Sequence, residues 1–248
     1  MIVSFDGPAT GSDNMRQDLD LLALAERSRT WHMRTYTWSP WCVSLGKHQP
    51  LDAVDANRLH ANGFDVVHRP TGGRAVLHAN ELTYCVAVPL SQGLTAQDIY
   101  AAVHTLIVAA LRSIGIPELE YQEVPTDLRL HYASSGVAGA SCFTSSARSE
   151  IMARGRKVVG SAQRVMQEMV LQHGSILCGP GHEKLAEVLR ADESARSVLR
   201  ERLQDGAIHL SDLAGKSITP EACAEAIERI AARIDPLASA PGSTLADL

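Results

Sequence analysis

Residues 69–78, Arg-Pro-Thr-Gly-Gly-Arg-Ala-Val-Leu-His, combine two adjacent glycines with two arginines. Adjacent glycines let backbone approach a ligand closely and adopt positive φ. Exposed N–H groups beside Arg69 and Arg74 would suit a carboxylate, a phosphate or a carbonyl. The local pattern alone equally fits a β-turn with two solvated arginines. It matches neither the P-loop nor the dinucleotide-binding fingerprint.

Residues 156–164, Arg-Lys-Val-Val-Gly-Ser-Ala-Gln-Arg, are a second candidate, because a strand here would place a lysine beside small residues. Strand alternation predicts that Lys157 shares a face with Val159 and Ser161, and that Val158, Gly160 and Ala162 share the other. The small face would admit a flat ligand or close packing. Lys157 could then point at an acyl carbonyl or a phosphate. The alternative is a strand lysine that faces solvent.

Cys142 and His173 are the remaining candidates for chemistry. A lone strand cysteine is most often a small buried hydrophobe, and a nucleophile would need a nearby cation or base to lower its pKa. His173 could act as a base or could be a core histidine with both nitrogens satisfied. The other histidines show no metal-ligand spacing, and no metal is expected. They are His32, His48, His60, His104, His131, His182 and His209.

Composition narrows the class of protein. The 248 residues are 45% hydrophobic and 21% charged, which is typical of a globular protein. A net charge of −5 argues against bulk binding of nucleic acid. Five widely spread cysteines without a C-x-x-C fit neither a disulfide framework nor a zinc site. With no transmembrane run and no signal peptide in the sequence, we expect a cytoplasmic protein.

Periodicity predicts helices and strands without regular β-α-β alternation, which favours an α+β fold with a mixed sheet and helices packed on it. Helices are expected over residues 14–28, with Asn14 as N-cap, and over 52–62, 95–114, 182–191, 195–204 and 221–234. Strands are expected over residues 34–38, 42–45, 64–68, 82–88, 140–143, 150–153, 157–162 and 165–177. We expect one domain over 1–248, with a helical C-terminal part at about 181–236 and a loose tail at 237–248.

Taken together, these segments resemble the biotin/lipoate A/B protein ligase family, most closely its octanoyltransferase branch. The resemblance runs through most of the chain, and the order and spacing of the pieces are specific. The pieces include Val43-Ser-Leu-Gly46, residues 69–78, Glu81-Leu-Thr-Tyr84, Cys142-Phe143, Gly155-Arg-Lys-Val-Val-Gly-Ser-Ala-Gln163 and Leu171-Gln-His-Gly-Ser-Ile176. The family implies a mixed, largely antiparallel sheet packed with helices, an acyl tunnel and a carrier-protein acceptor.

The resemblance also implies roles for residues. Cys142 would attack the thioester of octanoyl-acyl carrier protein, and Lys157 would orient the acyl carbonyl and favour the thiolate. The acyl group would then pass to a lysine of a lipoyl domain or of the glycine cleavage H protein. Substrate contacts would come from Arg69, Thr71, Gly72, Gly73, Arg74, Ala75, His78, Gly160, Ser161, Ala162, His173 and Gly174.

Two alternatives stay open beside the transferase. An ATP-dependent lipoate–protein ligase would need ATP and Mg²⁺, whereas the transferase needs no cofactor. Such ligases usually carry three consecutive glycines in the first motif, and Arg74 replaces the third here, as in transferase-like members. A carrier-binding subunit without catalysis would need neither Cys142 nor Lys157. The sequence departs from the family where Ala79-Asn80 follows the motif histidine and His68 precedes Arg69.

Overall fold

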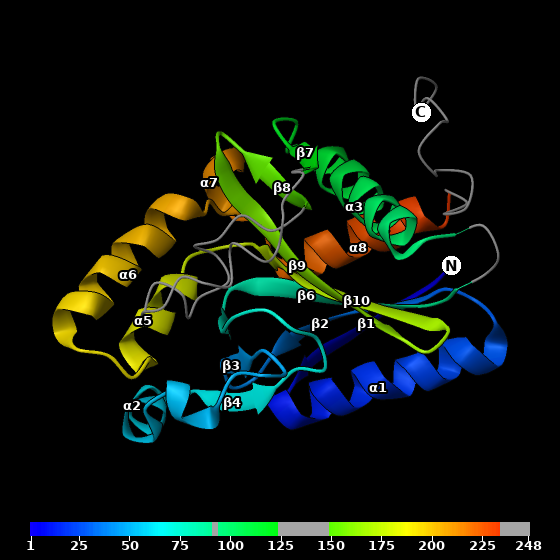
Figure 1. The fold of residues 1–248 in the computed structure, drawn as a ribbon. Coiled ribbons are helices and arrows are strands. Elements are labelled where there is room, and N and C mark those ends of the chain that lie inside the picture. Colours follow the sequence, from blue (N-terminus) through cyan, green and yellow to red (C-terminus); the bar gives the residue numbers. More distant parts are fainter. Residues whose placement is uncertain (91–93, 124–148, 234–248) are drawn as a thin grey trace.

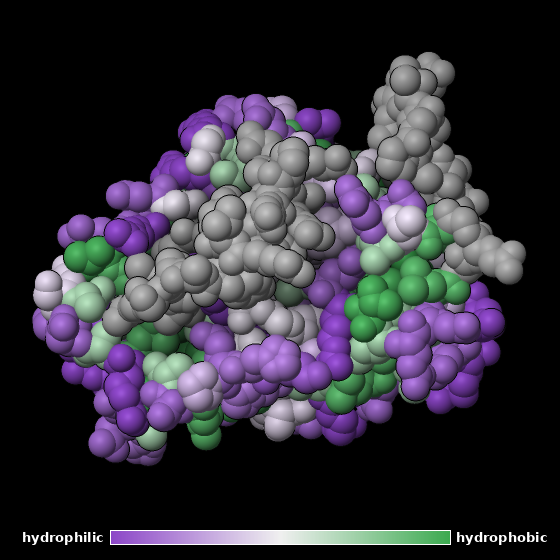
Figure 2. Space-filling view, in the orientation of Figure 1, coloured by the Kyte–Doolittle hydropathy of each residue, from purple (hydrophilic) through white to green (hydrophobic). Residues whose placement is uncertain are grey.

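The computed structural model describes residues 1–90, 94–123 and 149–233 of the chain. Cys142, the strand expected at 140–143 and the tail expected at 237–248 lie outside these residues. Within them, a large sheet and a small sheet are covered by helices, so the expected α+β class with a mixed, mostly antiparallel sheet is confirmed (Figure 1). The face seen in Figure 2 is mostly hydrophilic, with a hydrophobic patch over the β9–β10 hairpin, where Val165 is 49% exposed.

The large sheet has the strand order β1-β2-β6-β10-β9-β8-β7 among the described residues. Its strands are β1 (Ile2–Ala9), β2 (His32–Trp38), β6 (Glu81–Pro89), β7 (Glu120–Glu123), β8 (Ser149–Ala153), β9 (Arg156–Met166) and β10 (Met169–Leu177). β1 pairs with β2 in parallel, and the other pairs are antiparallel. The small sheet has the order β4-β3-β5, from β3 (Cys42–Leu45), β4 (Asp65–His68) and β5 (Val76–His78).

Helices bury both faces of the large sheet (Figure 1). The helices are α1 (Gly11–Ser28), α2 (Ala56–Asn62), α3 (Ala96–Ser113), α5 (Leu185–Val188), α6 (Glu193–Gly206), α7 (Leu210–Ala214) and α8 (Pro220–Ala231), with short 3₁₀ turns η1 (Leu51–Ala53) and η4 (His182–Lys184). Leu82, Tyr84 and Val86 of β6 pack in the cluster with α3 and α8. Cys85 and Ala87 pack in the cluster with α1 on the opposite face. Burial on both faces explains why β6 is apolar from Tyr84 to Pro89 rather than alternating.

Local capping signals located several helices correctly. Thr95 and Asp98 form a reciprocal capping box at the start of α3. Thr219 caps α8 and Pro220 occupies its first turn, as predicted. Gly63 closes α2 in the left-handed conformation.

Other predicted boundaries were wrong, because a different residue caps the helix or turns the chain. Thr10, not Asn14, caps α1, and Asn14 is buried and donates to the carbonyl of Thr37 at 3.1 Å. Asp55 caps α2, so that helix begins four residues later than expected. The single strand expected at 165–177 is instead a hairpin, because Gln167 turns the chain at φ +54°. β1 and α7 were not predicted.

A β-bulge corrects the expected faces of β9. Ile151 of β8 lies opposite Val159, whereas Met152 lies opposite Lys157, so Val158 is an extra residue in β9. Val158 and Val159 are consequently both buried in the cluster under α3. The predicted alternation, with Lys157 and Val159 on one face and Val158 on the other, therefore fails at this point.

Candidate functional site

A cavity opens where α1, the small sheet and the centre of the large sheet meet. It encloses about 460 Å³ of space, part of it open to solvent. Its wall is formed by Met15, Tyr36, Trp38, Ser44, Arg69, Val76, His78, Thr83, Gly160, Ser161, Ala162, His173, Gly174 and Ser175. Apolar atoms dominate this wall, and the polar groups on it are few and fixed by one another. This composition suits an apolar ligand with one polar group.

Arg69 holds the glycine loop rather than facing solvent. Its side chain is buried, and Nη1 donates to the carbonyl of Ser44 at 2.9 Å. Nη2 donates to the carbonyls of Gly72 at 2.9 Å and Arg74 at 2.7 Å. Gly73 has φ +96°, and a Cβ on Gly46 would lie 2.0 Å from its carbonyl oxygen. The reading of Arg69 as a solvated turn residue is therefore wrong, and Arg69 fixes the loop against β3.

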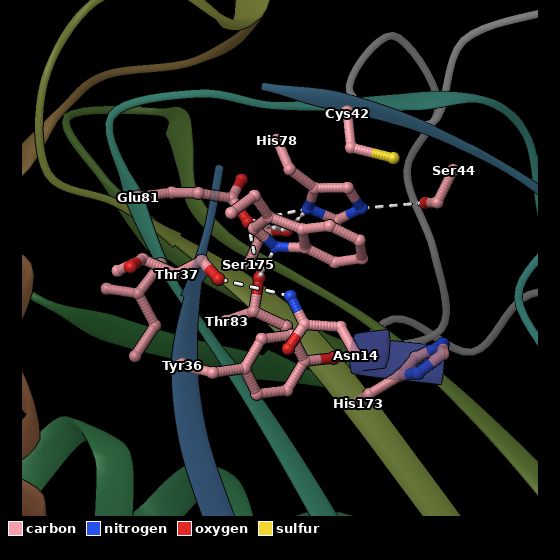
Figure 3. A network of polar contacts seen from close by, with 12 residues as sticks. Asn14, Tyr36, Thr37, Cys42, Ser44, His78, Glu81, Thr83, His173 and Ser175 are labelled. Atoms are coloured by element: carbon pink, nitrogen blue, oxygen red, sulfur yellow. Dashed lines mark hydrogen bonds and ion pairs between the residues drawn. The ribbon is translucent and has the colours of Figure 1, made fainter. Parts of the chain in front are cut away.

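His78 lies in a buried polar network at the cavity (Figure 3). Its Nδ1 is 2.6 Å from Oε1 of Glu81, and its Nε2 is 2.7 Å from Oγ of Ser44. A carboxylate can only accept, so Nδ1 carries the proton that is shared with Glu81. In the neutral ring, Nε2 then accepts from Ser44. Trp38 stacks on the His78 ring with centroids 4.1 Å apart, which fixes the ring plane.

His173 lies in a second carboxylate–imidazole–hydroxyl chain. Its Nε2 is 2.5 Å from the Thr71 hydroxyl, and its Nδ1 is 3.5 Å from Oδ2 of Asp18. Asp18 is fully buried and also accepts from Nη1 of Arg34 at 2.7 Å. Burial lowers the pKa of His173, so its ring is neutral at pH 7. His173 has both nitrogens satisfied and still reaches the cavity wall.

Ser161 joins a third set of polar groups. Its hydroxyl is 2.6 Å from the Tyr84 hydroxyl and 2.8 Å from Nε2 of His104. Burial lowers the pKa of His104 to about 3, and raises the pKa of Tyr84 to about 12. All of these groups are therefore uncharged at neutral pH, which keeps charge away from this part of the cavity wall.

Lys157 is buried rather than exposed to solvent. Only 3% of Lys157 and 5% of Glu150 is accessible, and Nζ of Lys157 forms an ion pair with Oε1 of Glu150 on the neighbouring strand. The alternative of a solvent-facing strand lysine is therefore wrong. Lys157 does not contribute to the wall of the described cavity.

The predicted site residues divide into three groups. Those on the cavity wall are Arg69, His78, Gly160, Ser161, Ala162, His173 and Gly174. Thr71 reaches the site through its contact with His173, while Gly72, Gly73, Arg74 and Ala75 shape the adjoining loop without lining the wall. Cys142 lies outside the described residues.

Sequence reasoning missed several residues at the cavity. Trp38, Ser44, Thr83 and Ser175 line the cavity, and Asp18 and Glu81 orient its two histidines. Alternating polar residues within the apolar run of β6 were the available signal for Glu81 and Thr83. No local pattern distinguishes Asp18 from the other acidic residues of α1.

The described cysteines are poor nucleophiles. Cys42, Cys85, Cys178 and Cys223 are all buried. Burial raises the pKa of Cys42 and Cys85, and the contact with Cys223 raises the pKa of Cys178. None of the four lines the cavity. Among the described residues, no helix is both long and apolar enough to cross a membrane.

The sequence matches the family described as "Lipoyl protein ligase A/B catalytic domain" over residues 11–231. Curated relatives named "Octanoyltransferase LipM" include a protein from Kyrpidia tusciae that is 36% identical over 214 residues, which are 82% of this chain and 77% of that protein. Another, from Staphylococcus aureus, is 31% identical over 222 residues, covering 87% of this chain and 80% of that protein.

Solved structures with similar folds agree with the family match. A chain from the structure of a bi-partite lipoate protein ligase and its E2 lipoyl domain from Thermoplasma acidophilum aligns with a TM-score of 0.70 at 18% identity, over 94% of this chain and 82% of that one. Lipoate-protein ligase A bound with ATP aligns with a TM-score of 0.65 at 20% identity, over 94% and 85% of the two chains. At these identities the likeness concerns the fold.

Proposed function

The chain belongs to the lipoyl protein ligase A/B catalytic-domain family, and from that membership we propose that it is an octanoyltransferase in protein lipoylation. It moves an octanoyl group from octanoyl-acyl carrier protein to a lysine of a lipoyl domain or of the glycine cleavage H protein. The observation that carries this proposal is the similarity to octanoyltransferases over about four-fifths of the chain. The relatives' names support the octanoyl group and the acceptor class, and the acyl carrier protein donor is what the family resemblance implies.

The cavity supports binding of an acyl chain. An octanoyl group has seven carbons beyond its carbonyl, and burial at about 0.8 kcal/mol per methylene gives roughly 5–6 kcal/mol. Met15, Val76 and Ala162 supply apolar wall, and Gly160 and Gly174 line it without side chains. Because His104 and His173 are neutral, the acyl chain would meet no buried charge from these two rings.

The transfer would proceed in two thioester steps. The Cys142 thiolate attacks the donor carbonyl, and the carrier thiol leaves with a proton. The acceptor lysine amine then attacks the Cys142 thioester, an amide forms, and the cysteine is released as the leaving group. A thioester is already activated, so this route consumes no ATP and needs no cofactor.

Residues of this chain have distinct proposed roles in those steps. Lys157 supplies a buried cation, held by Glu150, that favours the Cys142 thiolate and the developing oxyanion. His78 is oriented by Glu81 and by the Trp38 stack, and its Nε2 is hydrogen-bonded to the Ser44 hydroxyl on the cavity wall. Through that hydroxyl it can take up the proton that the amine loses. Backbone N–H groups of the loop fixed by Arg69 can bind the carbonyl oxygen.

A donor-choice experiment tests the proposal. The purified protein is incubated with a lipoyl domain and either octanoyl-acyl carrier protein without ATP, or free octanoate or lipoate with ATP and Mg²⁺. A lipoyl domain whose acceptor lysine is replaced by arginine is the control. The proposal predicts modification of the lysine only from octanoyl-acyl carrier protein. Modification only with ATP and the free acid would instead make the protein a lipoate–protein ligase, and no modification in either arm would favour a carrier-binding subunit.

A further inference from the structure

Two histidines and a glutamate meet away from the acyl cavity. His182 and Glu183 lie in η4 just after β10, and His209 lies immediately before α7. One ring nitrogen of His182, one carboxylate oxygen of Glu183 and one ring nitrogen of His209 all lie within 4.8 Å of one another. His182 and His209 are far apart in the sequence, so no metal-ligand spacing could reveal this cluster. The expectation of no metal was based on such spacing and therefore did not apply to it.

The hydrogen bonding of His182 leaves the correct nitrogen for a ligand. Its Nε2 is 3.0 Å from the carbonyl of Leu203, and since a carbonyl only accepts, Nε2 carries the proton. In the neutral ring, Nδ1 therefore presents its lone pair toward Glu183 and His209. Donation of the distal N–H to a backbone carbonyl is the usual arrangement of a metal-ligating histidine.

Carboxylates complete the donor set. Nδ1 of His209 is buried and makes no hydrogen bond, although Oδ2 of Asp212 lies 2.8 Å away. Oε2 of Glu183 is 3.5 Å from Nδ1 of His182 and accepts from the backbone N–H of Gly181 at 2.8 Å, which orients it. The two carboxylates of this donor set, Glu183 and Asp212, would balance the charge of a divalent cation.

We propose that His182, Glu183 and His209, with Asp212 beside them, bind a divalent transition-metal ion of the Zn²⁺ class. Mixed imidazole and carboxylate donors suit Zn²⁺, whereas Ca²⁺ and Mg²⁺ prefer oxygen alone. Zinc bonds of about 2.0–2.2 Å place tetrahedral donors roughly 3.4 Å apart. The widest present separation therefore closes by roughly 1.4 Å on binding, which side-chain rotation of Glu183 and His209 can supply.

A bound ion would link two segments of the chain near the proposed catalytic residue Lys157. Ile208 donates its backbone N–H to the carbonyl of Lys157 at 2.9 Å, and Ala207 forms a bridge with Lys157. His209 follows directly in the chain. An ion held by His182 and His209 therefore ties the end of β10 to the segment that is hydrogen-bonded to the Lys157 backbone. An ion that binds only the folded state raises the unfolding free energy by RT ln(1 + c/Kd), where c is the concentration of the free ion.

The test measures metal binding and not activity. The full chain is stripped with a chelator, then titrated with Zn²⁺ against a chromophoric competitor and, separately, with Co²⁺ as a spectroscopic probe. The wild type should bind one Zn²⁺ per chain, and Zn²⁺ should raise its melting temperature. Glu183→Gln keeps an oxygen for the Gly181 N–H, and His209→Gln changes the more accessible histidine. Each should weaken Zn²⁺ binding by at least about ten-fold while melting normally without metal.

The matched control is His60→Gln, which removes an exposed histidine of α2 and should bind Zn²⁺ like the wild type. Wild-type affinity in either Glu183→Gln or His209→Gln would overturn the proposal, as would the absence of stoichiometric binding to the wild type. A Co²⁺ spectrum with thiolate charge-transfer bands would place the ion on cysteines and would overturn it too. None of these readouts depends on whether the octanoyl-transfer proposal holds.

Discussion

Single and double replacements of Lys157 and Glu150 should separate the contribution of this ion pair to stability from the proposed role of Lys157 in octanoyl transfer. The two side chains are 4% and 6% exposed and form an ion pair between β9 and β8. Lys157→Met leaves the Glu150 carboxylate buried without this cation. Loss of one partner of a buried pair costs about 3–5 kcal/mol of unfolding free energy. Glu150→Met, which leaves the ammonium buried without this carboxylate, should cost a similar amount.

The double variant Lys157→Met/Glu150→Met removes both charges and keeps the volume. Replacement of a buried ion pair by apolar residues is often close to neutral, so the double variant should regain most of the lost stability. The coupling free energy from the cycle should therefore be about 3 kcal/mol or more. Octanoyl transfer should nevertheless stay at least about 100-fold below wild type, because the cation at the thioester is still missing.

Two assays on the wild type, the two single variants and the double variant distinguish a chemical role of Lys157 from a structural one. Chemical denaturation gives the unfolding free energies, and the rate of lipoyl-domain octanoylation gives activity. Recovery of wild-type transfer in the double variant would refute a chemical role for Lys157 and leave it a purely structural residue. Unchanged stability in both single variants would refute the coupling of the pair.

Three further predictions concern the cavity and its histidines. Gly174→Ala places a Cβ 2.5 Å from the Gly160 carbonyl oxygen. It should lower the unfolding free energy by about 1–3 kcal/mol and raise the KM for the octanoyl donor. An unchanged KM in the folded variant would contradict the cavity assignment. A hexanoyl donor loses two methylenes, about 1.6 kcal/mol, and should bind about 15-fold more weakly in competition assays, with equal binding arguing against apolar burial. Because folded His104 stays neutral down to about pH 3 while its unfolded form takes up a proton below about pH 6.5, this histidine alone should lower stability by about 1.2 kcal/mol between pH 7 and 5.5. His104→Gln should reduce the measured fall in stability by that amount, and an identical fall would contradict the assignment.

Local sequence signals predicted the elements whose ends depend on local bonds. The Thr95–Asp98 capping box and the Thr219–Pro220 pair each act within one turn of helix, so their types and spacing are enough. The cap of α1 failed because Asn14 has a distant partner in the carbonyl of Thr37, which no local pattern contains. The predicted alternation of faces failed at Val158 for the same reason, because the bulge there depends on the register of β9 with β8.

The site shows the same division. The motifs predicted that residues 69–78 and the strands at 156–164 and 171–177 converge, and seven of their predicted residues line one cavity. The Arg69 side chain, predicted as a substrate contact, lines the cavity and also donates to backbone carbonyls of its own loop. Glu81 lies only three residues from His78. Asp18, by contrast, contacts His173 from 155 residues away in the sequence, so its role depends on packing. The His182–His209 cluster likewise exists only in three dimensions.

The central claim is that octanoate passes through a thioester on Cys142. Intact-protein mass spectrometry after mixing with octanoyl-acyl carrier protein, without ATP and without acceptor, tests it directly. The account predicts one octanoyl group on the wild type, removable by hydroxylamine and absent from Cys142→Ala, while Cys42→Ala still acquires it. No adduct on the wild type, or an adduct that persists in Cys142→Ala, would contradict the account.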